Sequence, residues 1–158
     1  MALEIERKFL VKDCWQPRDS GEYMLQGYIA DSQRGAGRLS VRVRIVGERA
    51  YLNLKSRISS VSRHEYEYLI PLDDARELLK NFAGPLVEKT RYKELHDGKC
   101  WEIDVFAGDN AGLIVAELEL DSETASFERP DWLGAEVTAD DRYLNTSLAV
   151  KPYKLWDK

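Results

Sequence analysis

The first segment of the chain places charged side chains at every second position, as Glu4, Glu6 and Lys8. In an extended strand, residues two apart project from the same side, so these three share one face while Ile5 and Phe9 share the other. Carboxylates are oxygen ligands for divalent metals, and basic side chains bind phosphate groups. A face of this composition indicates a site for a charged ligand.

The same spacing returns along the chain. Further pairs of charged or polar residues, each separated by one mostly apolar residue, are Arg42 and Arg44, Asn53 and Lys55, Glu65 and Glu67, Lys89 and Arg91, Glu102 and Asp104, and Glu117 and Glu119. Acids and bases enclosed together cannot stay unpaired, because an uncompensated buried charge costs several kcal/mol. A linear polyphosphate chelated by Mg²⁺ or Mn²⁺ would satisfy both charge types at once.

Alternating polarity predicts eight strands, at residues 3–12, 23–30, 38–46, 50–56, 63–72, 87–95, 99–107 and 113–120. The short connections favour antiparallel hairpins, and eight antiparallel strands tend to close into a barrel that can hold one small ligand. Helices are expected from an N-cap at Asp73 through Phe82, near 123–127 and near 140–150.

The apolar faces of these helices need an apolar sheet surface to cover. We therefore expect an α+β fold, mainly β with flanking α-helices, in which an eight-stranded antiparallel closed β-barrel forms a charged tunnel. The alternative is an ordinary barrel with its apolar face inward and its charges in water, as in a carrier of apolar ligands.

The composition sets further bounds. With 158 residues, 44% hydrophobic and 32% charged, the chain fits a single globular domain spanning 1–158. A net charge of −5 disfavours nucleic acid and anionic membranes as partners. Cys14 and Cys100 lack metal-ligand spacing and indicate a reducing compartment, and no apolar run reaches the roughly 20 residues of a membrane span. We expect a cytoplasmic protein; whether it is a monomer or a homodimer stays open.

The segment Glu4-Ile5-Glu6-Arg7-Lys8 resembles the N-terminal ExExK signature of the CYTH family, the triphosphate tunnel metalloenzymes. This family includes class IV adenylate cyclases, thiamine triphosphatases and bacterial inorganic triphosphatases. Segments similar to further family patterns follow in order at 25–28, 41–44, 54–55, 65–67, 87–92, 102–106, 117–119 and 136–143. ExExK alone is a weak signal, but the ordered set is specific.

The resemblance implies roles for individual residues. Metal ligands would be Glu4, Glu6, Asp104, Glu117 and Glu119. Triphosphate ligands would be Lys8, Arg42, Arg44, Lys55, Lys89 and Arg91. Tyr28 and Lys89 resemble the catalytic pair that orients and deprotonates the attacking water. Two alternatives stay open for Glu65 and Glu67, a second metal site or salt bridges to the arginines, and two for Arg142, contact with a terminal phosphate or pairing with a tunnel carboxylate.

The compact chain is most similar to the short bacterial members. That likeness implies metal-dependent hydrolysis of a small triphosphate, in the first place inorganic tripolyphosphate to pyrophosphate and phosphate. The alternatives are cyclisation of ATP, hydrolysis of thiamine triphosphate, and a non-catalytic module that binds polyphosphate or nucleotide. Tyr28 and Lys89 favour hydrolysis, and the complete carboxylate set argues against the module. No motif identifies an organic group on the triphosphate.

Overall fold

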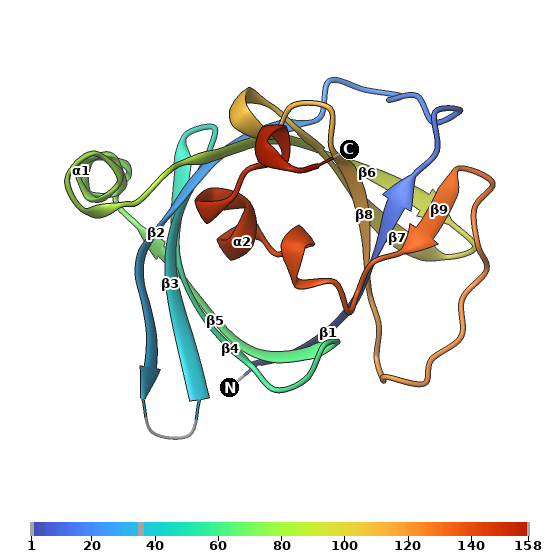
Figure 1. The fold of residues 1–158 in the computed structure, drawn as a ribbon, viewed down its shortest axis with the longest axis horizontal. Helices are drawn as coiled ribbons and strands as arrows, with labels where there is room; N and C mark the ends of the chain where they lie inside the picture. The colour runs from blue at the N-terminus through green and yellow to red at the C-terminus, as the bar shows by residue number, and fades with distance from the viewer. Residues whose placement is uncertain (1, 35–36, 158) are drawn as a thin grey trace.

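Nine strands follow one another in the computed structural model, which describes residues 2–34 and 37–157 (Figure 1). They are β1 (Ala2–Val11), β2 (Glu22–Arg34), β3 (Gly37–Val46), β4 (Arg49–Arg57), β5 (Ser62–Ile70), β6 (Val87–His96), β7 (Lys99–Phe106), β8 (Ile114–Glu119) and β9 (Leu133–Glu136). The first eight correspond to the eight predicted strands. β9 was not predicted, because four residues around a glycine carry no periodic signal.

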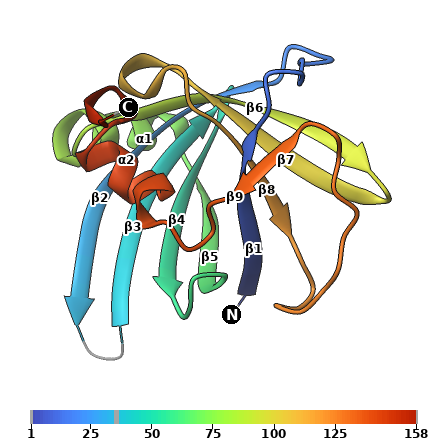
Figure 2. The ribbon, with the colours of Figure 1, turned by 45° about the vertical axis from the view of Figure 1, so that its right-hand side comes forward.

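The eight predicted strands close into an antiparallel barrel. Their order in the sheet is β5-β4-β3-β2-β6-β7-β8-β1, and β5 pairs back onto β1. β9 pairs with the C-terminal end of β1, at Phe9 and Val11. The ribbon seen from the side shows the strands surrounding one interior (Figure 2). The predicted α+β fold with a closed eight-stranded antiparallel barrel is confirmed.

The hairpin between β6 and β7 shows how the sequence sets these connections. Asp97 and Gly98 both have positive φ, at 49° and 71°. A two-residue hairpin turn of the type that matches strand twist requires this backbone, which aspartate tolerates and glycine adopts without steric cost. Lys89 is thereby paired with Phe106 and Arg91 with Asp104, which places charged residues of both strands in the tunnel.

The longest helix lies outside the barrel, as predicted. α1 (Leu72–Phe82) begins two residues earlier than predicted: its N-cap is Pro71, and the predicted N-cap Asp73 lies in its first turn. It buries Ala75 and Leu79 against Val43 and Ala50 of the sheet. Fully burying a leucine-sized side chain contributes about 1.5–3 kcal/mol, which explains why this helix covers an apolar sheet face.

The C-terminal helices differ from the expectation. η2 (Asp141–Tyr143) and α2 (Asn145–Val150) lie over one end of the barrel instead of outside it (Figure 1). Two further short helices are η1 (Gly108–Asn110) and η3 (Tyr153–Leu155). No helix forms at 123–127, where the prediction was wrong: Phe127 packs edge-to-face against Phe9 and Trp101, and this tertiary packing decides the conformation.

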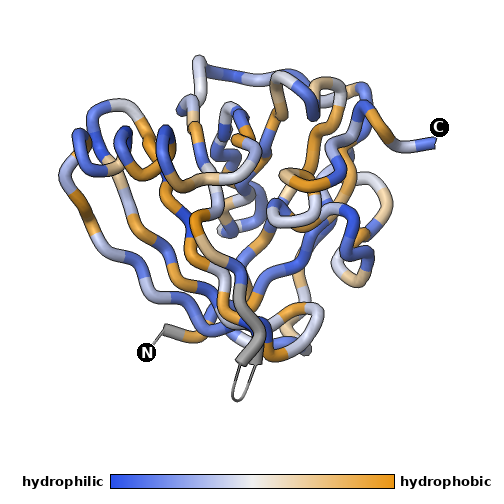
Figure 3. Tube along the Cα trace, turned by 60° about the vertical axis from the view of Figure 1, so that its left-hand side comes forward, coloured by the Kyte–Doolittle hydropathy of each residue, from blue (hydrophilic) through white to orange (hydrophobic). Residues whose placement is uncertain are grey.

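The two faces of the barrel have opposite character. Outward-facing Phe9, Trp101, Ile103 and Leu118 are buried in an apolar cluster beneath the segment that contains β9. Coloured by hydropathy, the strands alternate between apolar and polar residues along their length (Figure 3). The apolar face therefore looks outward and the charged face inward, which excludes the inverted barrel. None of the helices in the described chain is long and apolar enough to cross a membrane.

Candidate active site in the barrel tunnel

The barrel encloses a cavity of about 330 Å³ whose lining is mainly charged. Its basic residues are Lys8, Arg38, Arg42, Arg44, Lys55, Arg57, Arg63 and Arg91. Its acidic residues are Glu4, Glu6, Asp31, Glu65, Glu67, Glu102, Glu117, Glu119 and Asp141. Tyr28 also lines it, so the structure brings together the predicted site residues on its lining except Lys89 and Asp104, which share the inward face with Arg91 and Glu102 but are fully buried and do not line the cavity.

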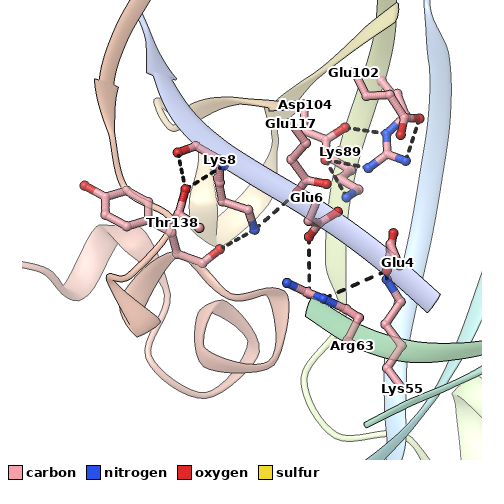
Figure 4. A network of polar contacts seen from close by, with 12 residues as sticks. Glu4, Glu6, Lys8, Lys55, Arg63, Lys89, Glu102, Asp104, Glu117 and Thr138 are labelled. Atoms are coloured by element: carbon pink, nitrogen blue, oxygen red, sulfur yellow. Dashed lines mark hydrogen bonds and ion pairs between the residues drawn. The ribbon is translucent and has the colours of Figure 1, made fainter. Parts of the chain in front are cut away.

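β1 supplies the first charged row of the tunnel, as its spacing predicted (Figure 4). Lys8 Nζ lies 3.2 Å from Glu117 Oε1 and donates to the Tyr143 carbonyl oxygen at 3.1 Å. Lys55 Nζ lies 3.1 Å from Glu4 Oε2. The register places Lys8 opposite Glu117 on β8, so the contact follows from strand pairing. In this structure each acid of the row is held by a base of the protein.

Two of the predicted metal ligands have raised pKa values. Burial, followed by the charge of Glu117, raises the pKa of Glu6 to about 7. Burial, followed by the charges of Glu4 and other acids, raises the pKa of Glu119. Repulsion between neighbouring carboxylates is relieved by a divalent cation, and the donor set consists of the hard oxygens that Mg²⁺ and Mn²⁺ prefer. The residues present therefore fit such a metal.

The structure does not contain a ready-made metal cage. Within the described residues, no three histidine, cysteine, aspartate or glutamate side chains converge in a way that would hold a metal ion. The acids instead point at lysines and arginines of the same tunnel. A metal bound here would exchange protein cations for itself, which requires side-chain movements but no change of the barrel.

Asp104 is the centre of a buried ion-pair network. Lys89 Nζ lies 2.6 Å from Asp104 Oδ2, and Arg91 donates to both oxygens of Asp104, with Nε at 2.7 Å and Nη2 at 2.9 Å. Arg91 also contacts Glu102 at 2.9 Å. Although burial disfavours its charge, Arg91 and Lys89 hold the pKa of Asp104 below its usual range. Both oxygens of this predicted metal ligand are thus engaged by bases.

Lys89 occupies an unusual environment for an amine. Its side chain is fully buried, and this burial lowers its pKa to about 7 even though Asp104 favours the charged form. Arg91 and Arg44 add repulsion. A lysine with a pKa close to neutrality can both accept and donate a proton, a property that a catalytic lysine requires.

Arg42 and Arg44 concentrate positive charge on β3. Arg42 is 4% exposed, and its Nε has no hydrogen-bond partner among the described residues. Arg44 Nε donates to Gln26 Oε1 at 3.0 Å. Burial, followed by the charges of Arg42 and Arg91, lowers the pKa of Arg44 to about 9. Guanidinium groups that repel each other in a closed space form a site for an anion, because phosphate oxygens would neutralise them.

Tyr28 lies at the point where β2 bulges. Its Cα pairs with that of Arg42, and the register shifts between Tyr28 and Ala30. Its ring packs partly against the apolar cluster around Val87 and Leu148 while the residue also lines the tunnel. Bulges redirect side chains and are frequent next to active sites, and this one places Asp31, three residues later, in the same cavity.

Glu65 and Glu67 accept hydrogen bonds from a neutral side chain. Asn53 Nδ2 donates to Glu67 Oε2 at 2.6 Å and to Glu65 Oε1 at 3.4 Å, and Lys55 lies 3.6 Å from Glu65. These contacts favour a supporting role over a second metal site. Arg142 lies outside the tunnel lining: it pairs with Asp140 at 2.6 Å and stacks over Trp156.

Arg63 is a tunnel residue that was not among the predicted site residues. It lines the tunnel, with Nη1 3.2 Å from Glu6 Oε1. The signal was available, because Arg63 precedes Glu65 by two positions in a predicted strand and therefore shares its face. The residues 144–147 of the C-terminal segment, which also line the cavity, carried no such signal, since they come from a helix over the tunnel end.

A closed barrel with an apolar exterior and an interior of paired acids and bases defines a class of proteins that bind a small, highly charged anion in a tunnel. The profile of the CYTH domain matches residues 2–151. The chain therefore belongs to the CYTH family, as its motifs predicted. Membership of this family implies dependence on a divalent metal ion.

Similar proteins cover nearly the whole chain. An inorganic triphosphatase of Acetivibrio thermocellus is 45% identical over 157 residues, 98% of this chain and 97% of the relative. An inorganic triphosphatase of Nitrosomonas europaea is 39% identical over 150 residues, 93% of this chain and 97% of the relative. A crystal structure of an inorganic triphosphatase is 38% identical, with a TM-score of 0.67, covering 95% of this chain and 96% of that one.

A putative adenylate cyclase of Bacillus halodurans has the same fold, with a TM-score of 0.57 at 14% identity over 78% of this chain and 84% of that one. At this identity the likeness concerns the fold alone, so the fold does not by itself separate hydrolysis from cyclisation.

Proposed function

We propose that this chain is a metal-dependent triphosphatase whose preferred substrate is inorganic tripolyphosphate, which it hydrolyses to pyrophosphate and phosphate. Two relatives at 45% and 39% identity are inorganic triphosphatases, and triphosphate hydrolysis is accordingly the activity of this chain. The observation that carries the substrate class is the repulsion among Arg42, Arg44 and Arg91 in an enclosed tunnel. A compact polyanion neutralises all three without an organic group.

Substrate and metal would bind by exchanging ion pairs. Lys8 and Lys55 leave Glu117 and Glu4 and join Arg42, Arg44 and Arg91 on the phosphate oxygens. The freed carboxylates Glu4, Glu6, Glu117 and Glu119 become available to the metal, with Asp104 behind them. The bound metal supplies neutralisation of charge on the phosphoryl oxygens. The acids exchange their basic partners for the metal, and the bases exchange their acidic partners for phosphate oxygens. Little uncompensated charge is therefore left buried.

In the chemical step, a water oxygen attacks the terminal phosphorus and the bond to the bridging oxygen breaks. The leaving pyrophosphate takes the electron pair, and the water proton passes to a base in the tunnel. Tyr28 lines the cavity and is the nearer candidate for contact with that water. Lys89, fully buried and paired with Asp104, could receive or supply a proton next to the tunnel lining, because Asp104 also bonds the lining residue Arg91. Fixed cations around the phosphates supply most of the stabilisation of the transition state.

Phosphate release should be measured from tripolyphosphate, ATP and thiamine triphosphate side by side, with Mg²⁺ and with Mn²⁺, and cyclic AMP should be assayed in the ATP reaction. We expect tripolyphosphate to have the largest kcat/KM, no cyclic AMP, and loss of activity with a chelator that either metal reverses. Faster turnover of either organic triphosphate would contradict the proposed substrate, and cyclic AMP formation would contradict hydrolysis.

Replacement of Arg42 or Arg44 by lysine is expected to raise KM for tripolyphosphate about tenfold, because lysine keeps the charge but loses the two-pronged hydrogen bond to phosphate. Steady-state kinetics would measure it. Arg7→Lys is the matched control, since Arg7 pairs with Glu136 outside the tunnel at 2.5 Å and should leave KM unchanged. An unchanged KM in both tunnel variants would show that these arginines do not hold the substrate.

A further inference from the structure

Arg63 spans the two carboxylates of the N-terminal strand. Its Nη1 lies 3.2 Å from Glu6 Oε1, and its Nε lies 3.9 Å from Glu4 Oε2 (Figure 4). The position follows from the closure of the barrel, where Arg63 of β5 is the pairing partner of Glu4 of β1. Its side chain is 15% exposed, so the guanidinium is a fixed charge of the tunnel and not a surface group.

The contact is electrostatic more than directional. Arg63 Nε is buried without a hydrogen-bond partner among the described residues, and 3.9 Å from Glu4 is beyond hydrogen-bond distance. By contrast, Arg91 makes a two-pronged pair with Asp104 at 2.7 and 2.9 Å. Arg63 thus neutralises its carboxylates without locking them, and other ligands can take their oxygens at low cost.

Glu4 and Glu6 depend on Arg63 to different degrees. Glu4 also pairs with Lys55 at 3.1 Å, whereas the ion pair found for Glu6 among the described residues is the one with Arg63. Both carboxylates belong to the metal site of the proposed function. A divalent cation that takes these oxygens must displace or repel the guanidinium beside them.

We propose that Arg63 is a positioning residue: it is the resident counter-cation of Glu4 and Glu6, holds both carboxylates on the tunnel face without metal, and competes with the metal for them. It thereby sets the metal concentration at which the site fills. This inference rests on the proposed metal site, and it assigns to Arg63 a role distinct from holding the substrate.

The test is binding of Mn²⁺ alone to the full chain, without substrate, by isothermal titration calorimetry. Arg63→Gln is expected to bind Mn²⁺ about fivefold more tightly than the wild type, since one competing charge next to the carboxylates is removed. Arg63→Lys keeps the charge but cannot span both carboxylates, so a smaller shift in the same direction is expected. In the metal-free state the Tm of Arg63→Gln should fall, because Glu6 loses its partner.

Arg7→Gln is the matched control, since it removes the arginine–glutamate pair between Arg7 of β1 and Glu136 of β9, outside the tunnel. It should leave the Mn²⁺ affinity unchanged. Equal or weaker Mn²⁺ binding in both Arg63 variants would overturn the inference. A raised KM for tripolyphosphate with unchanged Mn²⁺ affinity would also overturn it, because Arg63 would then be a substrate ligand. If the wild type itself binds no Mn²⁺, the proposed metal site is wrong. If the wild type binds Mn²⁺ and the Arg63 variants bind it with the same affinity, only the role proposed for Arg63 is wrong.

Discussion

Glu6→Gln and Glu4→Gln are each expected to lower the kcat of metal-dependent tripolyphosphate hydrolysis by roughly 10³-fold, because each removes a charged oxygen ligand from a site where the metal supplies several kcal/mol of charge stabilisation. Glutamine keeps the shape of the side chain, and at position 6 it removes a buried charge that is repelled by Glu117. The barrel should therefore stay folded. Activity assays over a range of Mg²⁺ concentrations, with circular dichroism and Tm of each variant, would measure both effects.

Glu136→Gln is the control for this pair of variants. Glu136 is a carboxylate of the outer face, bonded to Arg7 and to Thr138, and its loss should lower Tm at most and leave kcat unchanged. Wild-type activity of both Glu4→Gln and Glu6→Gln at ordinary Mg²⁺ would place the metal elsewhere. Partial activity restored by high Mg²⁺ would instead agree with a weakened ligand set.

Much of the fold could be predicted because strands impose a period of two. The alternation of Glu4, Glu6 and Lys8 with Ile5 and Phe9 identified the tunnel face before any coordinates, and the structure confirms that face. Turn chemistry at Asp97 and Gly98 predicted the hairpin that aligns two charged strands. Strand alternation and turn type depend only on residues adjacent in the sequence, so both can be predicted without knowledge of tertiary contacts.

Features that depend on tertiary contacts could not be predicted. The periodicity put Lys89 and Asp104 on the charged inward face but did not reveal that they pair with each other and are fully buried, because burial depends on register and on the covering residues. The bulge at Tyr28 and the placement of α2 over the barrel end follow from packing as well. Residues 123–127 form no helix, and Phe127 instead packs its ring edge-to-face against Phe9 and Trp101.

The pairing of acids with bases explains how the tunnel accommodates so many charged side chains. Arg91 with Asp104, Lys8 with Glu117 and Lys55 with Glu4 neutralise charges that would otherwise be buried alone. Such pairs contribute little net stability, because desolvation offsets their attraction. Their value lies in function: a tunnel whose acids and bases are already paired needs only to exchange these partners when metal and triphosphate bind.

Tyr28→Phe is expected to lower kcat by roughly 10²-fold, the effect of losing a positioned general base, with little change in KM. Phenylalanine keeps the ring that packs against the cluster around Val87 and Leu148, so only the hydroxyl group in the tunnel is lost. Tripolyphosphate hydrolysis by the wild type and the variant should be compared between about pH 7 and 10, where a base of this kind would act.

Tyr23→Phe is the matched control, because Tyr23 lies on the same strand but is 52% exposed and donates its hydroxyl hydrogen to Glu88 at 2.8 Å. It should hydrolyse tripolyphosphate as fast as the wild type. If Tyr28→Phe also keeps the wild-type kcat over the whole pH range, with its Tm unchanged, Tyr28 is a packing residue of the tunnel wall. Deprotonation of the water would then belong to Lys89, whose burial already brings its pKa to about 7, or to the metal.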